Sequence, residues 1–381
     1  MLHRAASYWE TNRTLGSFDV IVVGGGMVGL WTAYHLRHQS PALHICIVEQ
    51  FPSGQAGAST RNAGFACFGS PTELLDDMRH ESREDSITRL KWRYSGLQAW
   101  RSEFRDSDLG WQAGKGYEIF GPSQSKEWEA VLQNLDGLNE LASAAEIPGT
   151  VYQEVAPPVS SLLGCISIEH EAGLHAGMAH HALKSAVQSA GVEFLHGVEV
   201  PNQSQWRRDD ASWQLPTRQG RLNAHQVVLA TNAWTGALLN RTDVIPGRGQ
   251  VLLTQPIPDL PYRGTYHADE GYLYFRNLGD RLLLGGGRNA FRQDEETLSG
   301  ESTAQVQDYL EAYLRTVLLP GQVVEISERW AGTMAFAPNG SKMPLLESQN
   351  GVTVVARMGG MGVALSPEAG KKAAALVLAA R

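Results

Sequence analysis

Residues 18–49 read FDVIVVGGGMVGLWTAYHLRHQSPALHICIVE, and this stretch decides the fold prediction for the chain. Residues 18–23 are a β-branched run typical of a buried strand, and a glycine turn follows them. Residues 27–39 are predicted to form a helix, and residues 43–48 a second strand that ends at Glu49. Strand, turn, helix and strand together make a βαβ unit of the length that a dinucleotide-binding fold requires.

The turn carries the pattern G-x-G-x-x-G, formed by Gly24, Gly26, Met27, Val28 and Gly29. The first glycine permits the tight turn, the second lets a pyrophosphate approach the backbone, and the third permits close helix–strand packing. The helix N-terminus offers N–H groups and partial positive charge to the phosphates. Glu49, followed by Gln50, can accept both hydrogens of an adenosine ribose diol and would repel a 2′-phosphate, which argues against NADP. The motif by itself leaves NAD and FAD as alternatives.

Length and composition set the outer limits of the prediction. The chain has 381 residues, more than one core normally supports, so we expect two domains. Its net charge of −8 argues against a nucleic-acid partner, and its three scattered cysteines against a disulfide framework or a metal site. No apolar run reaches the length of a membrane span, and the first 17 residues lack the apolar region of a signal peptide, so a cytoplasmic location is expected.

Three further segments identify a family resemblance: GASTRNAG at 57–64, VVLATNAW at 227–234 and GGMG at 359–362. Together they resemble the D-amino-acid oxidase family of flavoproteins, which includes glycine oxidase, sarcosine oxidase and the γ-glutamylputrescine oxidases. The resemblance covers nearly the whole chain, including 7–9, 246–250 and 329–332. It implies FAD, bound non-covalently, because no cysteine follows Cys165 in the region where sarcosine oxidases attach flavin.

The resemblance also implies positions around the cofactor. The pyrophosphate and ribityl chain should lie against Ser59, Thr60, Arg61, Asn62 and Gly64. Val200 should meet the adenine through its backbone, and Thr231 should lie in a strand-end turn over the cofactor. The last segment should place backbone N–H groups near the flavin pyrimidine edge, where a helix N-terminus stabilises developing negative charge. That segment comprises Gly359, Gly360, Met361 and Gly362.

The expected reaction is oxidation of the C–N bond of a small amine or amino acid by hydride transfer to FAD, with oxygen or an unknown acceptor taking the electrons. Alternation places Tyr272, Tyr274 and Arg276 on one face of a strand. The resemblance implies a tyrosine of this strand over the substrate, with Tyr272 the best match, so these three are the candidate catalytic residues. The expected fold is α/β. Residues from about 72 to 145 are expected to be helical, with Leu90, Tyr94, Leu97 and Trp100 as a core stripe, and residues 352–356 to form the last strand. A split Rossmann-like FAD domain (1–80, 150–235, 330–381) would interleave with a largely antiparallel substrate domain (81–149, 236–329).

The substrate site departs from the family pattern. Glycine oxidase-like members hold the substrate carboxylate with two arginines, and the corresponding positions here are Met334 and about Gly360. Methionine cannot replace a bidentate arginine, so the pocket is predicted to take a secondary amine or a longer substrate, unless another cation serves. The candidate cations are Arg248, Arg276, Arg329, Lys342 and Arg357.

Four other readings remain open. The chain could be an FAD-dependent 2-hydroxy-acid or glycerol-phosphate dehydrogenase, although the segment after Gly64 lacks the histidine of 2-hydroxyglutarate-oxidising relatives. It could be a flavoprotein subunit of a larger complex, the flavin domain of an RNA-modifying enzyme, or a flavin-binding protein without turnover. Cys67 is expected to be a buried inert thiol, and His175, His180 and His181 are expected to be structural.

Overall fold

The computed structural model describes residues 7–9, 16–52, 55, 57–209 and 212–380, and it divides into two compact units. Unit 1 comprises Met1–Thr60, Gly177–Pro246 and Met334–Arg381, and unit 2 comprises Arg61–Ala176 and Gly247–Thr333. These boundaries differ from the expected ones, because residues 61–80, 150–176 and 330–333 belong to unit 2 and residues 236–246 to unit 1. The reason is strand pairing, which draws residues 152–155 and 164–168 into the second sheet.

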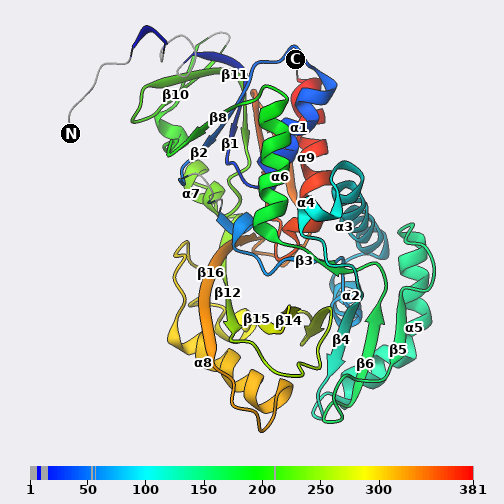
Figure 1. The fold of residues 1–381 in the computed structure, drawn as a ribbon. Coiled ribbons are helices and arrows are strands. Elements are labelled where there is room, and N and C mark those ends of the chain that lie inside the picture. The colour runs from blue at the N-terminus through cyan, green and yellow to red at the C-terminus, as the bar shows by residue number, and fades with distance from the viewer. Residues whose placement is uncertain (1–6, 10–15, 53–54, 56, 210–211, 381) are drawn as a thin grey trace. The chain divides into compact units, whose positions relative to one another are not determined.

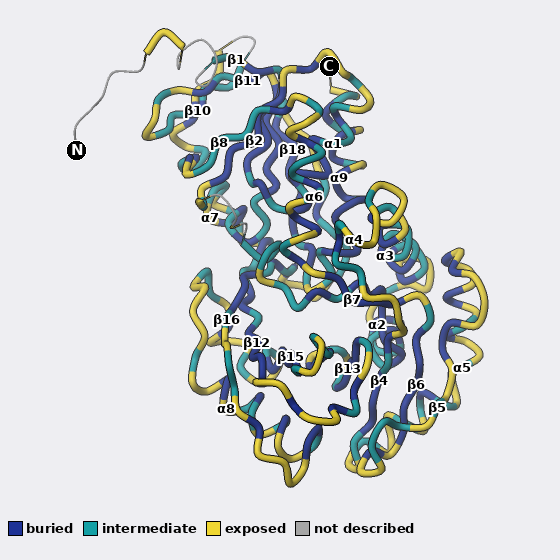
Figure 2. The backbone as a smooth tube through the Cα atoms, in the orientation of Figure 1, coloured by how far each residue is buried: buried dark blue, intermediate teal, exposed yellow. Residues whose placement is uncertain are grey.

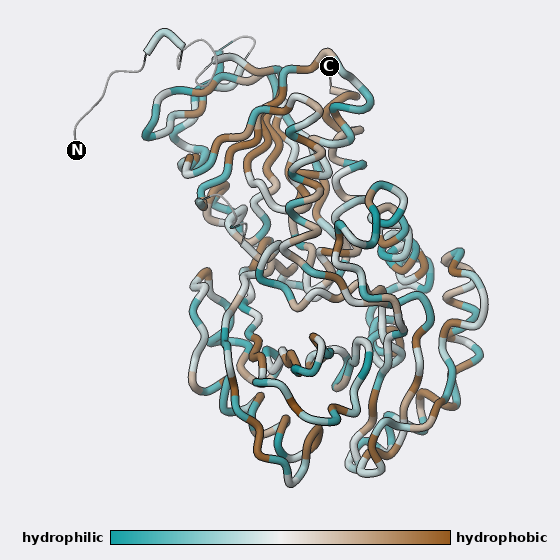
Figure 3. Tube along the Cα trace, in the orientation of Figure 1, coloured by the Kyte–Doolittle hydropathy of each residue, from teal (hydrophilic) through white to brown (hydrophobic). Residues whose placement is uncertain are grey.

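Unit 1 is built on a mainly parallel sheet (Figure 1). Its strands are, in spatial order, β17 (Leu345–Gln349), β18 (Val352–Ala356), β11 (Arg221–Leu229), β1 (Ser17–Val23), β2 (Ile45–Glu49) and β8 (Glu193–His196), with β10 (Trp213–Pro216) and β9 (Arg207–Arg208) beside β11. The strands from β18 to β8 run parallel. Strands β18, β1 and β2 are apolar and buried along almost their whole length, as strands covered on both faces must be, whereas the edge strand β8 is half-buried (Figures 2 and 3).

Helices pack on this sheet. They are α1 (Met27–Gln39), α6 (Ala176–Ser189), α7 (Thr235–Leu239) and α9 (Gly362–Ala379), with the short turns η2 (Gly57–Thr60), η3 (Gln203–Gln205) and η4 (Asn232–Trp234). In Figure 1, α1 and α9 run side by side. A Cβ on Gly370 would lie 2.6 Å from the Cβ of Trp31, so a glycine is needed where the two helices touch. The side chain of Gln226 on β11 donates to the carbonyl of Val377 at 2.9 Å, which fixes α9 on the sheet.

Unit 2 contains a largely antiparallel sheet, as predicted. Its order is β16 (Ile326–Phe336), β12 (Ile245–Thr254), β15 (Arg281–Gly286), β14 (Leu273–Leu278), β13 (Thr265–Ala268), β4 (Gly116–Phe120), β6 (Gly164–Ile168) and β5 (Tyr152–Val155). The pairs β12–β15, β15–β14, β14–β13, β4–β6 and β6–β5 are antiparallel, and the pair β13–β4 is parallel. The short strands β3 (Phe65–Ala66) and β7 (Ala172–Gly173) form a separate antiparallel pair.

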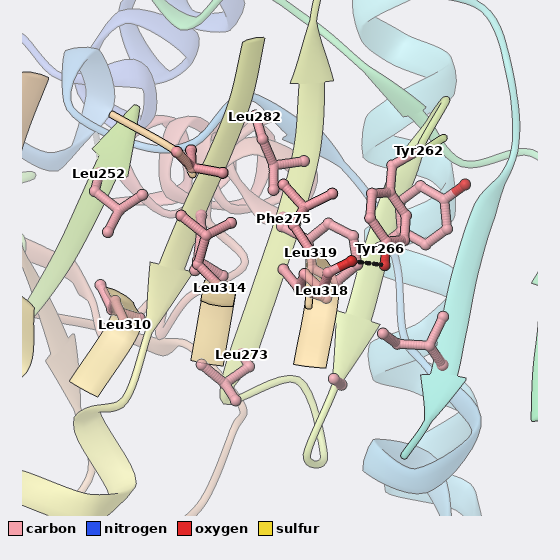
Figure 4. Close-up of a cluster of buried hydrophobic side chains, with 14 of the residues drawn as sticks. Leu252, Tyr262, Tyr266, Leu273, Phe275, Leu282, Leu310, Leu314, Leu318 and Leu319 are labelled. Carbon is pink, nitrogen blue, oxygen red and sulfur yellow. Dashed lines mark hydrogen bonds between the residues drawn. The ribbon is translucent and has the colours of Figure 1, made fainter. Parts of the chain in front are cut away.

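One face of this sheet carries the core of unit 2 (Figure 4). Leu273 and Phe275 of β14 alternate onto this face and meet leucines of α8 (Ala304–Tyr313) and of the π-helical turn η6 (Leu314–Leu318). The hydroxyl of Tyr262 donates to the carbonyl of Leu318 at 2.8 Å, drawn as the dashed line in Figure 4. The alternation of β14 therefore leaves Tyr274 and Arg276 for the opposite face.

The remaining helices are α2 (Pro71–His80), α3 (Arg83–Glu103), α4 (Asp106–Leu109), α5 (Ser125–Ala144) and the turn η5 (Arg288–Phe291). Residues 72–145 were expected to be helical throughout, and this was wrong at 116–120, which form β4. The segment GYEIF becomes a strand because it pairs with β6 on one side and β13 on the other, contacts distant in sequence. Leu90, Leu97 and Trp100 are buried as predicted. Within the described residues, no helix combines the length and apolar character needed to cross a bilayer.

Candidate functional site

The glycine turn between β1 and α1 has the geometry that the motif predicts. Gly24 has φ +107°, a region that favours glycine, and its N–H donates to the carbonyl of Val48 at 2.8 Å. A Cβ on Gly29 would lie 2.0 Å from the carbonyl oxygen of Gly24, so α1 could not pack so closely on the turn with any other residue. A Cβ on Gly26 would lie 2.9 Å from the hydroxyl of Ser59. The three glycines of the motif therefore add no side chain of their own where the motif predicts a diphosphate.

The Glu49 carboxylate closes the same turn from the end of β2. One oxygen accepts the Gly25 N–H at 2.8 Å, and the other accepts the Phe51 N–H at 2.9 Å. Burial raises the pKa of Glu49, while the backbone N–H donors act in the opposite direction. Each oxygen retains acceptor capacity, because a carboxylate oxygen has two lone pairs. Glu49 can therefore hold the backbone turn and a ribose diol together. Gln50 follows Glu49 in the chain. The backbone carbonyl of Glu49 accepts the Val198 N–H at 3.0 Å, and this bond places the buried Val200 near the end of β2.

The segment after β2 supplies a hydroxyl to the helix start. Ser59, on η2, accepts the N–H of Met27 at 2.9 Å, so it caps the first turn of α1, and Thr60 ends η2. Residues 61–64 belong to unit 2, where the guanidinium of Arg61 donates to the carbonyl of Ala331 at 3.1 Å. The side chain of Asn62 accepts the Gly64 N–H at 2.8 Å in a local turn. The predicted pyrophosphate segment is thereby divided between the two units.

Two later loops of unit 1 complete the strand-end edge. Thr231 follows β11, and its hydroxyl is 2.8 Å from that of Thr235. The loop after β18 contains Gly359, whose φ of +54° suits glycine and whose N–H donates to Ala335 at 3.0 Å. Gly360 and Met361 follow, and α9 begins at Gly362 with no acidic residue in its first turn. That helix N-terminus can face negative charge, as the sequence predicted for this loop.

These features fit FAD on the observations of this chain alone. The loops after β1, β2, β11 and β18 follow the carboxyl ends of neighbouring parallel strands, and such ends share one edge of a sheet. The edge combines a side-chain-free turn, a buried carboxylate and two helix N-termini without acidic first turns. A dinucleotide needs this combination of anion-binding backbone and ribose acceptor.

The three candidate catalytic residues do not share one strand face, and this corrects the prediction. β14 begins at Leu273, so Tyr272 lies outside the strand, in the turn that follows Asp269, and its side chain is 41% exposed. The reason is that residues 269–271 have positive φ and reverse the chain before the pairing of β14 begins. Tyr274 and Arg276 do share a face. Tyr274 is half-buried, and its ring lies over Gly285, where an added Cβ would be 2.5 Å from the ring. Burial raises the pKa of Tyr274 to about 12.

Arg276 has a structural set of contacts. It is buried, and its guanidinium donates to the carbonyls of Gly64 and Leu174 and to the side chain of Gln112. Burial lowers the pKa of Arg276 to about 10. These bonds tie β14 to the β3–β7 region, and direct contact of Arg276 with a substrate remains a prediction.

Other cations proposed for a substrate carboxylate are engaged with protein groups. Arg248 is buried and makes two bonds with the Glu295 carboxylate, at 2.9 and 2.6 Å. Arg329 donates to the side chains of Gln307 and Glu311. Arg357 donates to the carbonyl of Asp243 at 3.4 Å. Carboxylate capture by Arg248 or Arg329 would have to displace these bonds.

The two family arginine positions are neighbours in unit 1. A Cβ on Gly360 would lie 4.0 Å from the sulfur of Met334, which is van der Waals contact. The pair therefore forms one small apolar spot beside the loop that precedes α9. Sequence reasoning identified the two substitutions separately, and the structure brings them together.

Sequence reasoning missed an apolar patch on the second face of the unit 2 sheet. Val251, Leu253 and Leu283 are buried there, and Tyr274 and Trp330 pack against them. The ring of Phe65 meets Tyr274 edge-on with centroids 5.6 Å apart. Trp330 lies in 329–332, one of the segments that resemble the family, and that resemblance was the sequence signal that could have indicated the patch.

Cys67, expected to be an inert thiol, and His180, expected to be structural, are both buried. Cys67 is buried, and burial with the nearby carboxylates of Glu171 and Glu73 raises its pKa well above the ordinary value for a thiol, so the metal-free thiol is protonated. His180 is buried on α6, and its Nε2 lies 2.8 Å from the carbonyl oxygen of Gly25, so it links α6 to the glycine turn. That contact gives a structural histidine a direct link to the predicted cofactor loop.

Comparisons with known proteins agree with this arrangement. The bifunctional protein ThiO/ThiG of Trichormus variabilis is 25% identical over 86% of this chain and 47% of its own length, so the chain spans about half of that relative. Glycine oxidase from Geobacillus kaustophilus has a similar fold, with a TM-score of 0.75, 23% identity and 95% of each chain covered. Iminodiacetate oxidase from Chelativorans sp. BNC1 gives a TM-score of 0.72 at 19% identity, with 94% of this chain and 95% of that chain covered. The model of the DAO family, described as FAD dependent oxidoreductase, matches residues 19–376, and the chain belongs to this family.

Proposed function

We propose that this protein oxidises the C–N bond of a small amine, and that its preferred substrates lack a carboxylate held in the manner of an α-amino acid. The observation that carries the second part is the contact between Met334 and the position of Gly360. Neither residue can form a charged hydrogen bond to a carboxylate. The names of the similar proteins, glycine oxidase and iminodiacetate oxidase, support oxidation of a C–N bond.

The residues of unit 1 are assigned to the cofactor. The glycine turn and the start of α1 would hold the diphosphate, and Glu49 the adenosine ribose. The N-terminus of α9 and the loop at 359–362 would face the part of the flavin that gains negative charge. When bound, FAD accepts a hydride equivalent from the substrate carbon.

The apolar patch of unit 2 is assigned to the substrate. Tyr274 is held neutral by burial, so its hydroxyl can donate a hydrogen bond while its ring covers an apolar group. Tyr272 is more exposed and can reach a bound molecule from the adjoining turn. An apolar surface with few polar groups strips water from a neutral amine, the form that can lose hydride. We therefore expect secondary or apolar amines to be better substrates than glycine.

The first test is anaerobic reduction of the flavin in the full-length protein. A panel should contain primary and secondary amines, N-methyl amino acids, D- and L-amino acids, and 2-hydroxy acids. Loss of the oxidised-flavin absorbance with an amine, and weaker response to glycine, is the expected result. Reduction by hydroxy acids alone would replace this proposal with the hydroxy-acid dehydrogenase alternative. No reduction by any compound would favour a flavoprotein subunit or a protein without turnover.

The variant Met334→Arg tests the role of the apolar spot. If that spot determines selectivity, restoring a guanidinium should raise kcat/KM for small α-amino acids by at least about tenfold, equivalent to 1.4 kcal/mol. Met334→Leu, which keeps volume and apolarity, is the matched control and should leave the preference unchanged. An unchanged preference in both variants would remove the argument from this position.

The electron acceptor and the cellular location are also proposed. Oxygen is the simplest electron acceptor, and reoxidation of the reduced protein in air measures it directly. A cytoplasmic location is tested by fractionating cells that express the natural gene.

A further inference from the structure

A buried cluster in unit 2 lies outside the residues assigned to cofactor or substrate. The Cys67 sulfur, a Glu171 carboxylate oxygen and a His267 ring nitrogen all lie within 4.8 Å of one another. Pairing of β3 with β7 brings the first two together, because Ala66 opposes Ala172 in an antiparallel register. His267 comes from β13, and the three positions are separated by roughly a hundred residues each, so no sequence motif marks them.

The Glu171 carboxylate is oriented before any ligand arrives. One of its oxygens accepts the N–H groups of Phe68 and Gly69, at 3.0 and 3.4 Å. The other oxygen lies 2.9 Å from Nε2 of His267. A Cβ on Gly116 would lie 2.1 Å from that second oxygen, so β4 leaves space for the carboxylate at this point.

The separation of the carboxylate oxygen and the ring nitrogen suits a tetrahedral metal ion. With metal–ligand bonds of about 2.0 Å to nitrogen and oxygen, a tetrahedral zinc ion separates these two ligands by about 3.3 Å. The carboxylate oxygen and the ring nitrogen would move apart by only a few tenths of an ångström from their present 2.9 Å. Cys67, Glu171 and His267 are all buried, so the ion would be enclosed by unit 2, and the proposal assigns its fourth position to one water molecule.

The buried charged groups around the cluster have partners within unit 2. Glu118 lies opposite His267 in the β13–β4 pair, is buried, and bonds to the backbone N–H and hydroxyl of Thr72. Arg93, the buried cation nearby, bonds to Glu73 and to a backbone carbonyl. Buried carboxylates require a compensating positive charge, which the pairing of His267 with Glu171 supplies when the ring is protonated. A Zn²⁺ ion that replaces the protons of His267 and Cys67 would supply the same net charge.

We propose that Cys67, Glu171 and His267 bind one zinc-class divalent metal ion, with water as the fourth ligand. Thiolate, imidazole and carboxylate are zinc ligands, and the thiolate selects against magnesium and calcium. On binding, the Cys67 thiol and the protonated His267 ring each give one proton to solvent, and a sulfur–metal bond and a nitrogen–metal bond form. The ion ties the β3–β7 pair to β13 and thereby stabilises unit 2.

The test uses the full-length flavoprotein, stripped with a chelator and dialysed against Zn²⁺ or Co²⁺. Mass spectrometry of the metal content should give one ion per chain, and Co²⁺ should produce a near-ultraviolet thiolate charge-transfer band. Cys67→Ser should abolish the band and weaken Zn²⁺ binding by at least tenfold, and His267→Asn should weaken binding similarly. Cys165→Ser, which alters another buried thiol of unit 2, should keep both the ion and the band.

The wild-type protein alone also decides the question if a variant fails to fold. Zn²⁺ should raise the midpoint of thermal unfolding of the stripped protein, and the chelator should reverse the rise. Sub-stoichiometric metal with no thiolate band, or a band that persists in Cys67→Ser, would overturn the proposal. None of these readouts depends on the amine substrate, so the metal site and the proposed activity fail or stand separately.

Discussion

Replacing Gly29 by alanine tests whether α1 must touch the glycine turn. The added Cβ would lie 2.0 Å from the carbonyl oxygen of Gly24, whereas ordinary contacts begin at 3.4 Å. The helix and the turn must therefore separate by about 1.4 Å, the difference between these distances, or distort locally. Overpacking of this kind costs about 1–3 kcal/mol, against a gain of about 1 kcal/mol from alanine's higher helix propensity. We expect a net loss of stability in unit 1.

The same shift should weaken FAD binding, because it moves the N–H groups at the start of α1. A loss of 1.4 kcal/mol corresponds to a tenfold weaker affinity, which we take as the minimum effect. Flavin fluorescence quenching on titration into apoprotein measures it, and urea unfolding of the apoprotein measures stability. Gly137→Ala is the matched control, because this exposed helical glycine has nothing within 4 Å of its Cβ, and it should raise stability by up to about 1 kcal/mol. Equal FAD affinity in both variants would refute the close-packing argument.

Three further predictions concern buried polar groups. Burial lowers the pKa of His180 below its ordinary value of 6.5, and the neutral ring donates a hydrogen bond to the carbonyl of Gly25. The contribution of His180 to the free energy of unfolding is therefore complete above about pH 6.5. It is lost as the pH falls through the lower pKa of the folded state. His180→Gln should flatten this pH dependence between pH 7 and 5 in denaturant titrations, and an unchanged slope would assign it to other groups. Arg276→Met should cost about 2–4 kcal/mol in chemical denaturation because it leaves buried carbonyls without donors, and a loss below 0.5 kcal/mol would contradict that account. Glu49→Gln should weaken FAD about tenfold in the same fluorescence titration, since the amide cannot accept from the ribose, Gly25 and Phe51 together, and unaltered affinity would argue against a ribose contact.

The cofactor half of the fold could be predicted because its information is local. Residues 18–49 contain a complete βαβ unit, and the observed helix Met27–Gln39 has the predicted bounds. The last strand, Val352–Ala356, was also predicted with its correct ends, since a short apolar run before a glycine loop has few other structures available. Family resemblance then assigned the later loops to the same cofactor, an inference that residue patterns alone did not provide.

Unit 2 was predicted less well because its strands are defined by distant partners. The segment 116–120 was assigned to a helix, and its strand character comes from pairing with 164–168 and 265–267. The position of Tyr272 depended on where β14 begins, and that is set by the positive φ values of the preceding turn. The Cys67–Glu171–His267 cluster needs three registers to be known at once, so no single-sequence pattern could have located it.

The distribution of charge explains why substrate selectivity is harder to derive than cofactor binding. FAD binding relies on backbone N–H groups at strand ends, which any sequence with the right glycines presents at the same edge. Substrate binding relies on single side chains, and here the buried Arg248 already has a carboxylate partner within unit 2. An arginine that is paired in this way contributes to folding and offers little net charge to a ligand. The proximity of Met334 and Gly360 therefore carries more weight than the number of arginines in the chain, because the family resemblance puts the two carboxylate-binding arginines at these positions.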